Sequence, residues 1–273
     1  VGPVLAAVLI GLHPAFTLSF QYVLAGAVGV GVIGTVVQHF RYDAGDDTIG
    51  DSFDGLARIR TDLRQRPATL RPLLVGDTLV RFANGMVYVF FVLVVTRFYE
   101  VGFDATVAVG GISYGVDLTP AVFFGSLLGV EMLVALVTMA PAAKFAERVG
   151  LKPIVALGFL VYGTFPVVLI GGPALLAPVV PLQWAMVGVF AFSGLRFAGL
   201  PSHKALIVGP AEQNAGGRVT GTYYLLRNTV VIPSAALGGA LWEFVSPEVA
   251  FTIAAVVGVV GTGYFLLFGE EFD

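Results

Sequence analysis

Long apolar segments separated by short polar gaps dominate the chain. Seven of them are long enough, at about 20 residues for a hydrocarbon core roughly 30 Å thick, to cross a membrane as helices. They are residues 16–38, 72–96, 120–143, 153–171, 182–200, 219–242 and 248–268. An eighth, residues 1–13, is shorter, and we interpret it as the end of a helix that begins upstream. The pattern predicts an all-α membrane protein, a polytopic bundle of about eight spanning helices with the first one truncated.

Basic residues are confined to alternate gaps between these segments. Twelve of the 15 Lys and Arg residues lie in three groups. Basic loops resist translocation, so the gaps that hold them are expected to be cytoplasmic. The groups are Arg41, Arg58, Arg60, Arg64, Arg66 and Arg71; then Lys144, Arg148 and Lys152; then Arg196, Lys204 and Arg218. This distribution predicts a multi-pass protein of the plasma membrane, with residues 41–71 and the C-terminus in the cytoplasm.

The composition describes a chain whose main partner is the lipid bilayer. Hydrophobic residues make up 57% and charged residues 12%, whereas a soluble domain has about 25% charged residues. A net charge of -3 gives no indication of nucleic-acid binding, and the absence of Cys excludes thiolate metal sites. His13, His39 and His203 have no metal-ligand spacing. We therefore expect no cofactor and no metal, and interpret the three His as non-catalytic.

The polar stretch 41–71 contains a second, shorter pattern. After a Gly- and Asp-rich run, apolar residues recur at spacings of three and four, which predicts an amphipathic helix that Pro67 ends. These residues are Ile49, Phe53, Leu56, Ile59 and Leu63. The helix either lies on anionic headgroups or packs on the protein.

Small residues and prolines within the spans predict how the helices pack. In lipid, close backbone approach across small faces supplies much of the helix packing, and Gly125 with Gly129 and Gly238 with Gly239 offer such faces. Pro166 and Pro233 lie inside spans, where neighbouring helices or water must satisfy the backbone groups that a proline frees. We expect a bundle with bent or broken helices.

An enzymatic interpretation arises at residues 54–62, "DGLARIRTD". The fragment resembles the Asp-Gly-x-x-Ala-Arg metal-binding signature of membrane phospholipid synthases that use CDP-alcohols. Here one residue, not two, separates Gly55 from Ala57 and Arg58, and the downstream Gly and paired Asp are absent. Metal-dependent phosphotransfer needs that carboxylate cluster to bridge ion and phosphates, so we do not expect an enzyme.

A more specific resemblance begins at "APAAKFAERVGLKPIV", residues 140–155. It is similar to the Gly-x-Leu-Ala-Asp-Arg-x-Gly-Arg-Lys loop that follows the second helix of each six-helix half in the major facilitator superfamily of transporters. Ala143 and Leu151 depart from the pattern, at its first Gly and first Arg. The positions that carry it, to which the resemblance assigns a cytoplasmic gating role, are Ala143, Glu147, Arg148, Gly150 and Lys152.

The resemblance implies an organisation for the whole chain. Residues 71–96 then resemble the seventh helix of the family. Residues 1–40 would be the last two helices of the N-terminal half, 41–71 the cytoplasmic linker and 72–273 the C-terminal half. On this alignment the chain lacks the first four helices and is not expected to transport alone.

The first residues, "VGPVLAAVLIGL", resemble the fifth-helix motif of proton-coupled efflux antiporters in the same superfamily. Gly2 and Pro3 match its Gly-Pro pair, while Ala6 and Ala7 replace the glycines that follow. The resemblance implies a proton-coupled exporter of a small organic solute that works by alternating access and is monomeric when complete. An uptake transporter of the same fold, and a membrane protein that binds or signals without transport, remain alternatives.

We single out four ionisable side chains inside predicted spans: Asp77, Arg81, Glu131 and Arg227. Each costs at least about 2.5 kcal/mol at the centre of a membrane helix, so each is expected to face a cavity or a partner. Asp77 and Arg81 are four residues apart and close enough to pair, with Asn84 extending the same face. We interpret Asp77 as a proton-coupling or structural residue and Arg81 as part of a gate.

Glu131 lies near the middle of its span, with no basic neighbour on the same helix. Desolvation of a carboxylate favours its protonated form, which makes Glu131 our main candidate for proton coupling. The alternative is a structural role as the partner of Arg227, and the two roles are compatible.

The seventh segment combines a charge with polar and aromatic groups. Arg227 and Asn228, preceded by Tyr223 and Tyr224, are candidates for binding a substrate in a midplane cavity. Both tyrosines are alternatively interfacial anchors. We expect Asn84 and Tyr88 to face the same cavity.

Overall fold

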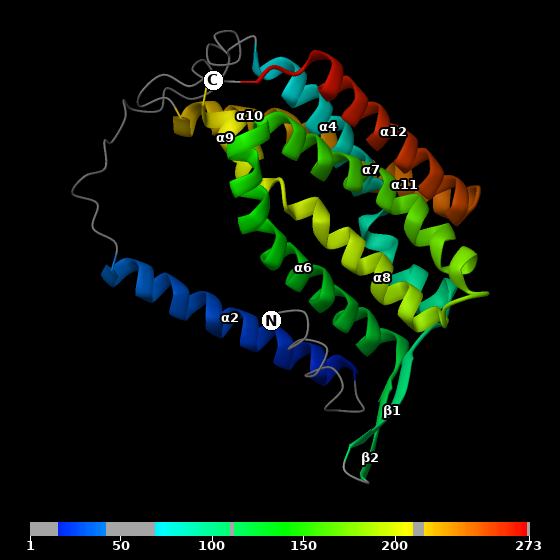
Figure 1. The fold of residues 1–273 in the computed structure, drawn as a ribbon. Helices are drawn as coiled ribbons and strands as arrows, with labels where there is room; N and C mark the ends of the chain where they lie inside the picture. The colour runs from blue at the N-terminus through cyan, green and yellow to red at the C-terminus, as the bar shows by residue number, and fades with distance from the viewer. Residues whose placement is uncertain (1–15, 42–68, 110–111, 210–215, 272–273) are drawn as a thin grey trace.

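The computed structural model describes residues 16–41, 69–109, 112–209 and 216–271. Every predicted long apolar segment corresponds to helix in this part of the chain (Figure 1). The helices are α2 (Phe16–Arg41), α4 (Leu70–Val87), η1 (Tyr88–Phe90), α5 (Phe91–Leu93), η2 (Val94–Phe98), α6 (Pro120–Val149), α7 (Leu151–Leu176), α8 (Leu182–Gly194), η3 (Leu195–Phe197), α9 (Leu200–Val208), α10 (Gly216–Val231), α11 (Ser234–Phe244) and α12 (Pro247–Phe268). The predicted segment 1–13 and the amphipathic helix within 41–71 lie outside the described residues.

Six helical segments are long and apolar enough to cross a membrane. They are Gln21–Arg41, Leu70–Phe98, Pro120–Val149, Leu151–Leu176, Leu182–Val208 and Pro247–Phe268. These lengths and apolar compositions are those of a multi-pass membrane protein. The number differs from the eight we expected, because residues 1–13 are not described and the predicted segment 219–242 is divided.

Pro233 divides that segment into α10 and α11. Proline has no N–H to donate to the preceding turn, and its ring clashes with the carbonyl four residues earlier. The helix therefore stops at Val231 and restarts at Ser234. Pro166, by contrast, lies inside the unbroken α7.

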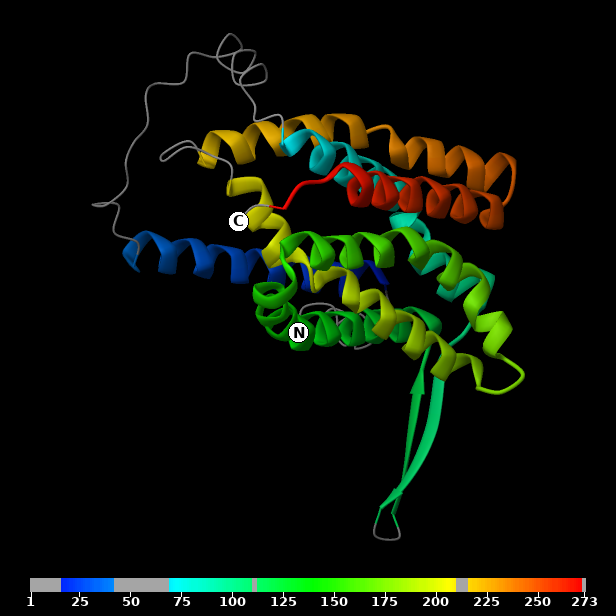
Figure 2. The same cartoon turned by 45° about the horizontal axis from the view of Figure 1, so that its top comes forward.

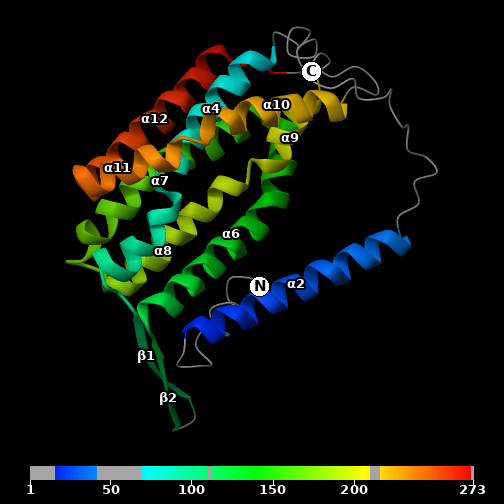
Figure 3. The ribbon, with the colours of Figure 1, turned by 180° about the vertical axis from the view of Figure 1, so that it is seen from behind.

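The centre of the bundle is formed by α4, α7 and α12, which lie side by side in Figures 1 and 3. Glycines allow the closest approach: a Cβ on Gly163 of α7 would lie 2.8 Å from the carbonyl carbon of Gly258 on α12. Gly238 of α11, one of the predicted packing residues, meets the backbone of Met86 on α4. The bundle is thus held by backbone contact at small residues, as expected for helices in lipid.

A β-hairpin separates α4 and its continuation from α6 and was not expected from the sequence. Strands β1 (Phe103–Val109) and β2 (Ile112–Leu118) pair antiparallel, with Phe103 opposite Leu118. Figure 2 shows the hairpin projecting from one end of the bundle. The Phe103 ring packs against Phe123 and Trp184, which fixes the base of the hairpin to the ends of α6 and α8.

Helix α2 lies apart from the rest of the bundle in Figures 1 and 3. None of its apolar window is buried, and large side chains such as Ile33 and Phe40 are exposed. This surface is suited to lipid or to other helices. The packing that positions the candidate site therefore comes from α4 to α12.

Candidate functional site

Asp77 is the centre of a buried charge cluster. Its side chain is 0% exposed, and its carboxylate lies 3.3 Å from Arg81 Nε, 3.1 Å from Arg227 Nη1 and 3.2 Å from His203 Nε2. The Tyr223 hydroxyl donates to Asp77 Oδ2 at 3.0 Å. We call Asp77, Arg81, His203, Tyr223 and Arg227 the Asp77 cluster.

Three helices supply this cluster. Asp77 and Arg81 are one turn apart on α4, and Tyr223 and Arg227 have the same spacing on α10, so each pair occupies one helix face. His203 completes the cluster from α9, which packs against α10. The predicted Asp77–Arg81 pair is confirmed. His203, which we interpreted as non-catalytic, is 4% exposed and lies against the carboxylate.

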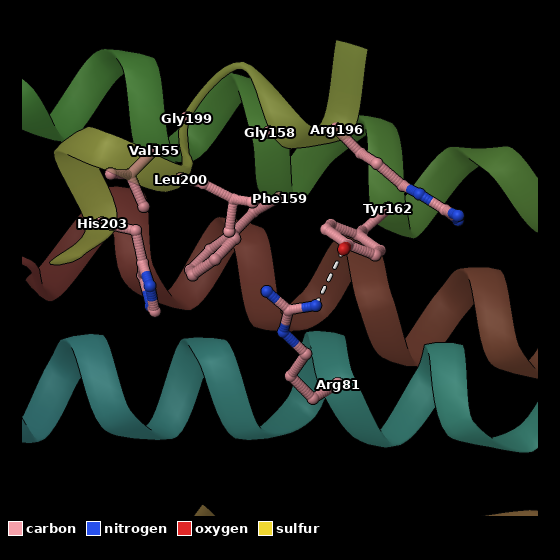
Figure 4. Close-up of a pocket in the computed structure, with 9 residues that line it drawn as sticks. All are labelled: Arg81, Val155, Gly158, Phe159, Tyr162, Arg196, Gly199, Leu200 and His203. Atoms are coloured by element: carbon pink, nitrogen blue, oxygen red, sulfur yellow. Dashed lines mark hydrogen bonds between the residues drawn. The ribbon is translucent and has the colours of Figure 1, made fainter. Parts of the chain in front are cut away.

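Arg81 also connects the cluster to α7. Its Nη1 donates to the Tyr162 hydroxyl at 2.8 Å, and its Cζ lies 4.5 Å from the centroid of the Tyr162 ring. Figure 4 shows Arg81 reaching toward Tyr162 from α4, while His203 approaches the same space from α9. The cavity between them, about 10 Å³, has room for about one water molecule.

A second buried ion pair joins Glu131 of α6 to Arg196 of η3. Glu131, 2% exposed, accepts hydrogen bonds through Oε1 from Arg196 Nη2 and Ser193 Oγ, both at 2.5 Å. Arg196 is 4% exposed, and its Cζ lies 4.8 Å from the Phe197 ring centroid and 5.0 Å from that of Tyr162. Within the described residues, Arg196 Nε and Nη1 have no hydrogen-bond partner.

This pair corrects two interpretations. Arg227 is not the partner of Glu131, because it binds Asp77 on another helix. Arg196, which we counted with the cytoplasmic basic residues, is buried where α8 gives way to η3, and Figure 4 shows its side chain extending past Tyr162. A helical periodicity cannot reveal either partner, since it does not tell which helices face each other.

An open cavity of about 390 Å³ lies beside the Asp77 cluster, between α4, α9 and α10. We call it the Arg227 cavity. Its lining residues are Arg81, Leu200, His203, Lys204, Tyr224, Arg227 and Asn228. Four predicted site residues, Arg81 of α4 and Tyr224, Arg227 and Asn228 of α10, therefore line the same cavity.

Two of the predicted residues lie elsewhere. Tyr88 is 52% exposed on η1, with its ring edge-to-face against Phe91. Asn84 is half-buried on α4 and does not line the Arg227 cavity. Lys204 and His203 line the cavity but were not predicted as site residues, because they lie in a gap between apolar segments that proves to be helical.

The predicted gating loop is mostly helical: residues 143–149 form the last turns of α6, residues 151 and 152 begin α7, and Gly150 makes the tight turn between them. Gly150 has a positive φ of 91°, which glycine adopts without strain. The backbone N–H groups of Leu151 and Lys152 donate to the Glu271 carboxylate at 2.6 and 2.8 Å, and Lys152 Nζ donates to the Gly269 carbonyl at 2.6 Å. The turn is thus fastened to the C-terminal tail. Ala143 and Glu147 line a cavity of about 480 Å³ beside it, and Arg148 is exposed.

The chain matches no protein-family model and no curated protein. Across the described residues, no group of three or more His, Asp and Glu side chains is arranged to hold a metal ion. The buried charge clusters and the Arg227 cavity are therefore the features of this chain that indicate a function.

Proposed function

We propose that this chain is part of a secondary active transporter of the major facilitator type, which exports a small organic solute in exchange for protons by alternating access. The observation that carries the proposal is the Asp77 cluster at the wall of the Arg227 cavity. Buried charges in apolar helices are expensive, and such residues commonly belong to substrate or ion pathways. Here they come from three helices and meet beside a cavity of ligand size.

The cluster is suited to switching because its ion pairs cross helix boundaries. Arg81 is on the same helix as Asp77, whereas Arg227 and His203 reach it from α10 and α9. A shift of α10 against α4 separates Arg227 from Asp77 but leaves Arg81 in place. The Asp77 carboxylate therefore keeps at least Arg81 as a partner in both arrangements. This lowers the free energy needed to change from one arrangement to the other.

The proton would be exchanged at the Asp77–His203 contact. Imidazole is the side chain that changes its charge near neutral pH, and His203 Nε2 faces the carboxylate directly. Protonation strengthens the contact between α9 and α4, and deprotonation weakens it. Glu131, our main candidate from the sequence, becomes the second candidate for proton exchange, since Arg196 compensates its charge in a separate buried pair.

The α6–α7 turn would act as the cytoplasmic latch in this scheme. Its hydrogen bonds to Glu271 and Gly269 join the start of α7 to the chain after α12. Because α7 and α12 also pack along their lengths, the latch keeps this pair together while other helices move.

The test measures proton movement driven by solute gradients in vesicles that contain the complete protein. Benzenesulfonate, phenyltrimethylammonium and benzenesulfonamide serve as anionic, cationic and neutral probes. An exporter moves protons opposite to at least one probe, and Asp77→Asn abolishes that movement while the matched hairpin variant Asp117→Asn retains it. Protons moving with the solute would overturn the export direction. Proton movement with none of the probes, or an active Asp77→Asn variant, would overturn the mechanism.

A further inference from the structure

The polar wall of the Arg227 cavity is dominated by cations. Arg81, Lys204 and Arg227 line it, together with His203 and Asn228. Within the described residues, the nearest carboxylate is that of Asp77, which is fully buried behind this wall and shared between two arginines. The surface offered to a ligand is therefore positive.

The Asn228 side-chain oxygen occupies the position on Arg227 that an anion would take. Its Nε and Nη2 donate to the Asn228 side-chain oxygen at 3.1 and 2.9 Å. These two N–H groups form the edge of a guanidinium that binds carboxylates with two parallel hydrogen bonds. Asn228 supplies one neutral oxygen where a carboxylate or sulfonate supplies two charged ones. Its side chain is exposed, so an incoming ligand can displace it.

The rest of the cavity suits an organic body rather than a bare ion. The Tyr224 ring lies under the Arg227 guanidinium, with 4.6 Å between Cζ and the ring centroid, and Leu200 adds an apolar side chain. A volume of about 390 Å³ lies within the range of about 300–1,000 Å³ for small-molecule sites.

The depth of the site makes an anion more favourable. Arg81 and Arg227 each lie eleven residues after the first residue of α4 and α10. At about 1.5 Å per residue this is roughly 16 Å along the axis, about half of a hydrocarbon core. The Arg81 and Arg227 side chains are 22% and 15% exposed, so their charges are only partly solvated, and an anion that pairs with them gains more than it would at a fully exposed surface.

From these contacts we propose that the Arg227 cavity binds a small organic anion whose charged group presents two oxygens to Arg227, with Lys204 as a second cation. This inference rests on the proposed function, since the anion would be the transported solute. In the complex, the anion replaces the Asn228 oxygen on Arg227 Nε and Nη2. Nη1 stays with Asp77, which couples ligand binding to the cluster.

The test is equilibrium binding to the purified complete protein in a neutral detergent, measured by titration calorimetry. Benzenesulfonate is expected to bind at least about tenfold more tightly than its neutral isostere benzenesulfonamide, which corresponds to about 1.4 kcal/mol. Phenyltrimethylammonium is expected not to bind. Equal affinities for the three probes would overturn the proposal.

Variants assign the binding to this cavity. Arg227→Gln and Lys204→Gln are each expected to weaken benzenesulfonate binding about tenfold, and Arg227→Lys to restore only part of it, because lysine lacks the planar fork. Asn228→Ala is expected to bind at least as tightly as the unmodified protein. Lys144→Gln, an exposed lysine of α6 outside the cavity, is the control. Because Lys204 is exposed, its variant tests the site even if Arg227→Gln fails to fold; unchanged binding in Lys204→Gln would overturn the assignment.

Some lipid headgroups are also anionic, so a competition experiment is needed to distinguish a lipid from a solute. Displacement of benzenesulfonate by phosphatidylglycerol, at concentrations where phosphatidylcholine has no effect, would assign the site to lipid and overturn the proposal. Binding without any solute-linked proton movement would overturn the transporter but not the anion site. Proton movement driven by the cationic probe, without anion binding, would overturn the anion site but not the transporter.

Discussion

Arg227 of α10 donates from Nη1 to Asp77 Oδ2 of α4 at 3.1 Å, joining two helices whose residues are 150 positions apart in the chain. The carboxylate is fully buried and the guanidinium side chain is 15% exposed. We expect Asp77→Asn and Arg227→Gln to be strongly non-additive, with a coupling energy of about 1–3 kcal/mol in a double-mutant cycle. Thermal unfolding in detergent measures it. The cycle between Asp117→Asn and Arg227→Gln, whose residues share no partner, should be additive within about 0.5 kcal/mol.

The buried Glu131–Arg196 pair gives a second prediction. Glu131→Gln leaves the Arg196 charge without a carboxylate among aromatic rings, so we expect a loss of about 3–5 kcal/mol in stability. The double variant Glu131→Gln, Arg196→Met should recover most of it, because an uncharged pair has no such penalty. Thermal unfolding is the measurement.

Proton movement in the same variants separates a structural role for Glu131 from a coupling role. If the double variant folds stably and its solute-linked proton movement is unchanged, Glu131 takes no part in coupling. Loss of proton movement with restored stability would support our original interpretation of Glu131 as a proton carrier.

His203 is expected to set the pH dependence of transport. His203→Gln keeps a hydrogen-bond donor beside Asp77 but cannot change its charge, so solute-linked proton movement should lose most of its pH dependence. Rates measured at several pH values test the prediction. His39→Gln, on the exposed α2, should retain the pH profile of the unmodified protein. A profile shared by His203→Gln would exclude His203 as the exchanging group.

The α7–α12 contact predicts a sharp difference between two glycines of one helix. A Cβ on Gly163 would meet the backbone of Gly258 at 2.8 Å, so Gly163→Ala must push the two helices apart, with a loss of about 1–3 kcal/mol. Gly171, also on α7, has nothing within 4 Å of its Cβ position. Gly171→Ala should be neutral or stabilising by up to about 1 kcal/mol, because alanine favours helix. Equal unfolding temperatures for the two variants would contradict the close approach.

The sequence was informative where a property is local to one helix. Apolar length located the described helices, and the i, i+4 spacing found the Asp77–Arg81 pair. The sequence could not identify contacts between residues of different helices, because such contacts depend on how each helix is rotated and on which helices are neighbours. Glu131 was therefore assigned the wrong arginine.

Other features were not predicted from the sequence, for different reasons. His203 lies in a gap between apolar segments, and a polar gap looks the same whether it is a loop or, as here, a short helix folded into the bundle. Arg196 lies near the end of the predicted segment 182–200, where it was counted with the cytoplasmic basic residues although it is buried. The hairpin at 103–118 was missed because it lies in a gap between long apolar segments, where two seven-residue strands leave no long apolar run.

The interruption at Pro233 divides the helix that carries Arg227 into two parts with unequal attachments. On one side, α11 is fixed, since Gly238 lies against the backbone of Met86 and Trp242 stacks on Phe90 with 4.9 Å between ring centroids. On the other side, α10 packs against the bundle through Tyr223 and Leu226 and adds the polar contacts to Asp77. Pro233 thus interrupts the hydrogen bonding between the part of the helix that carries Arg227 and the part that packs on Met86. In the alternating-access scheme proposed above, this break is where α10 would change its angle to α11.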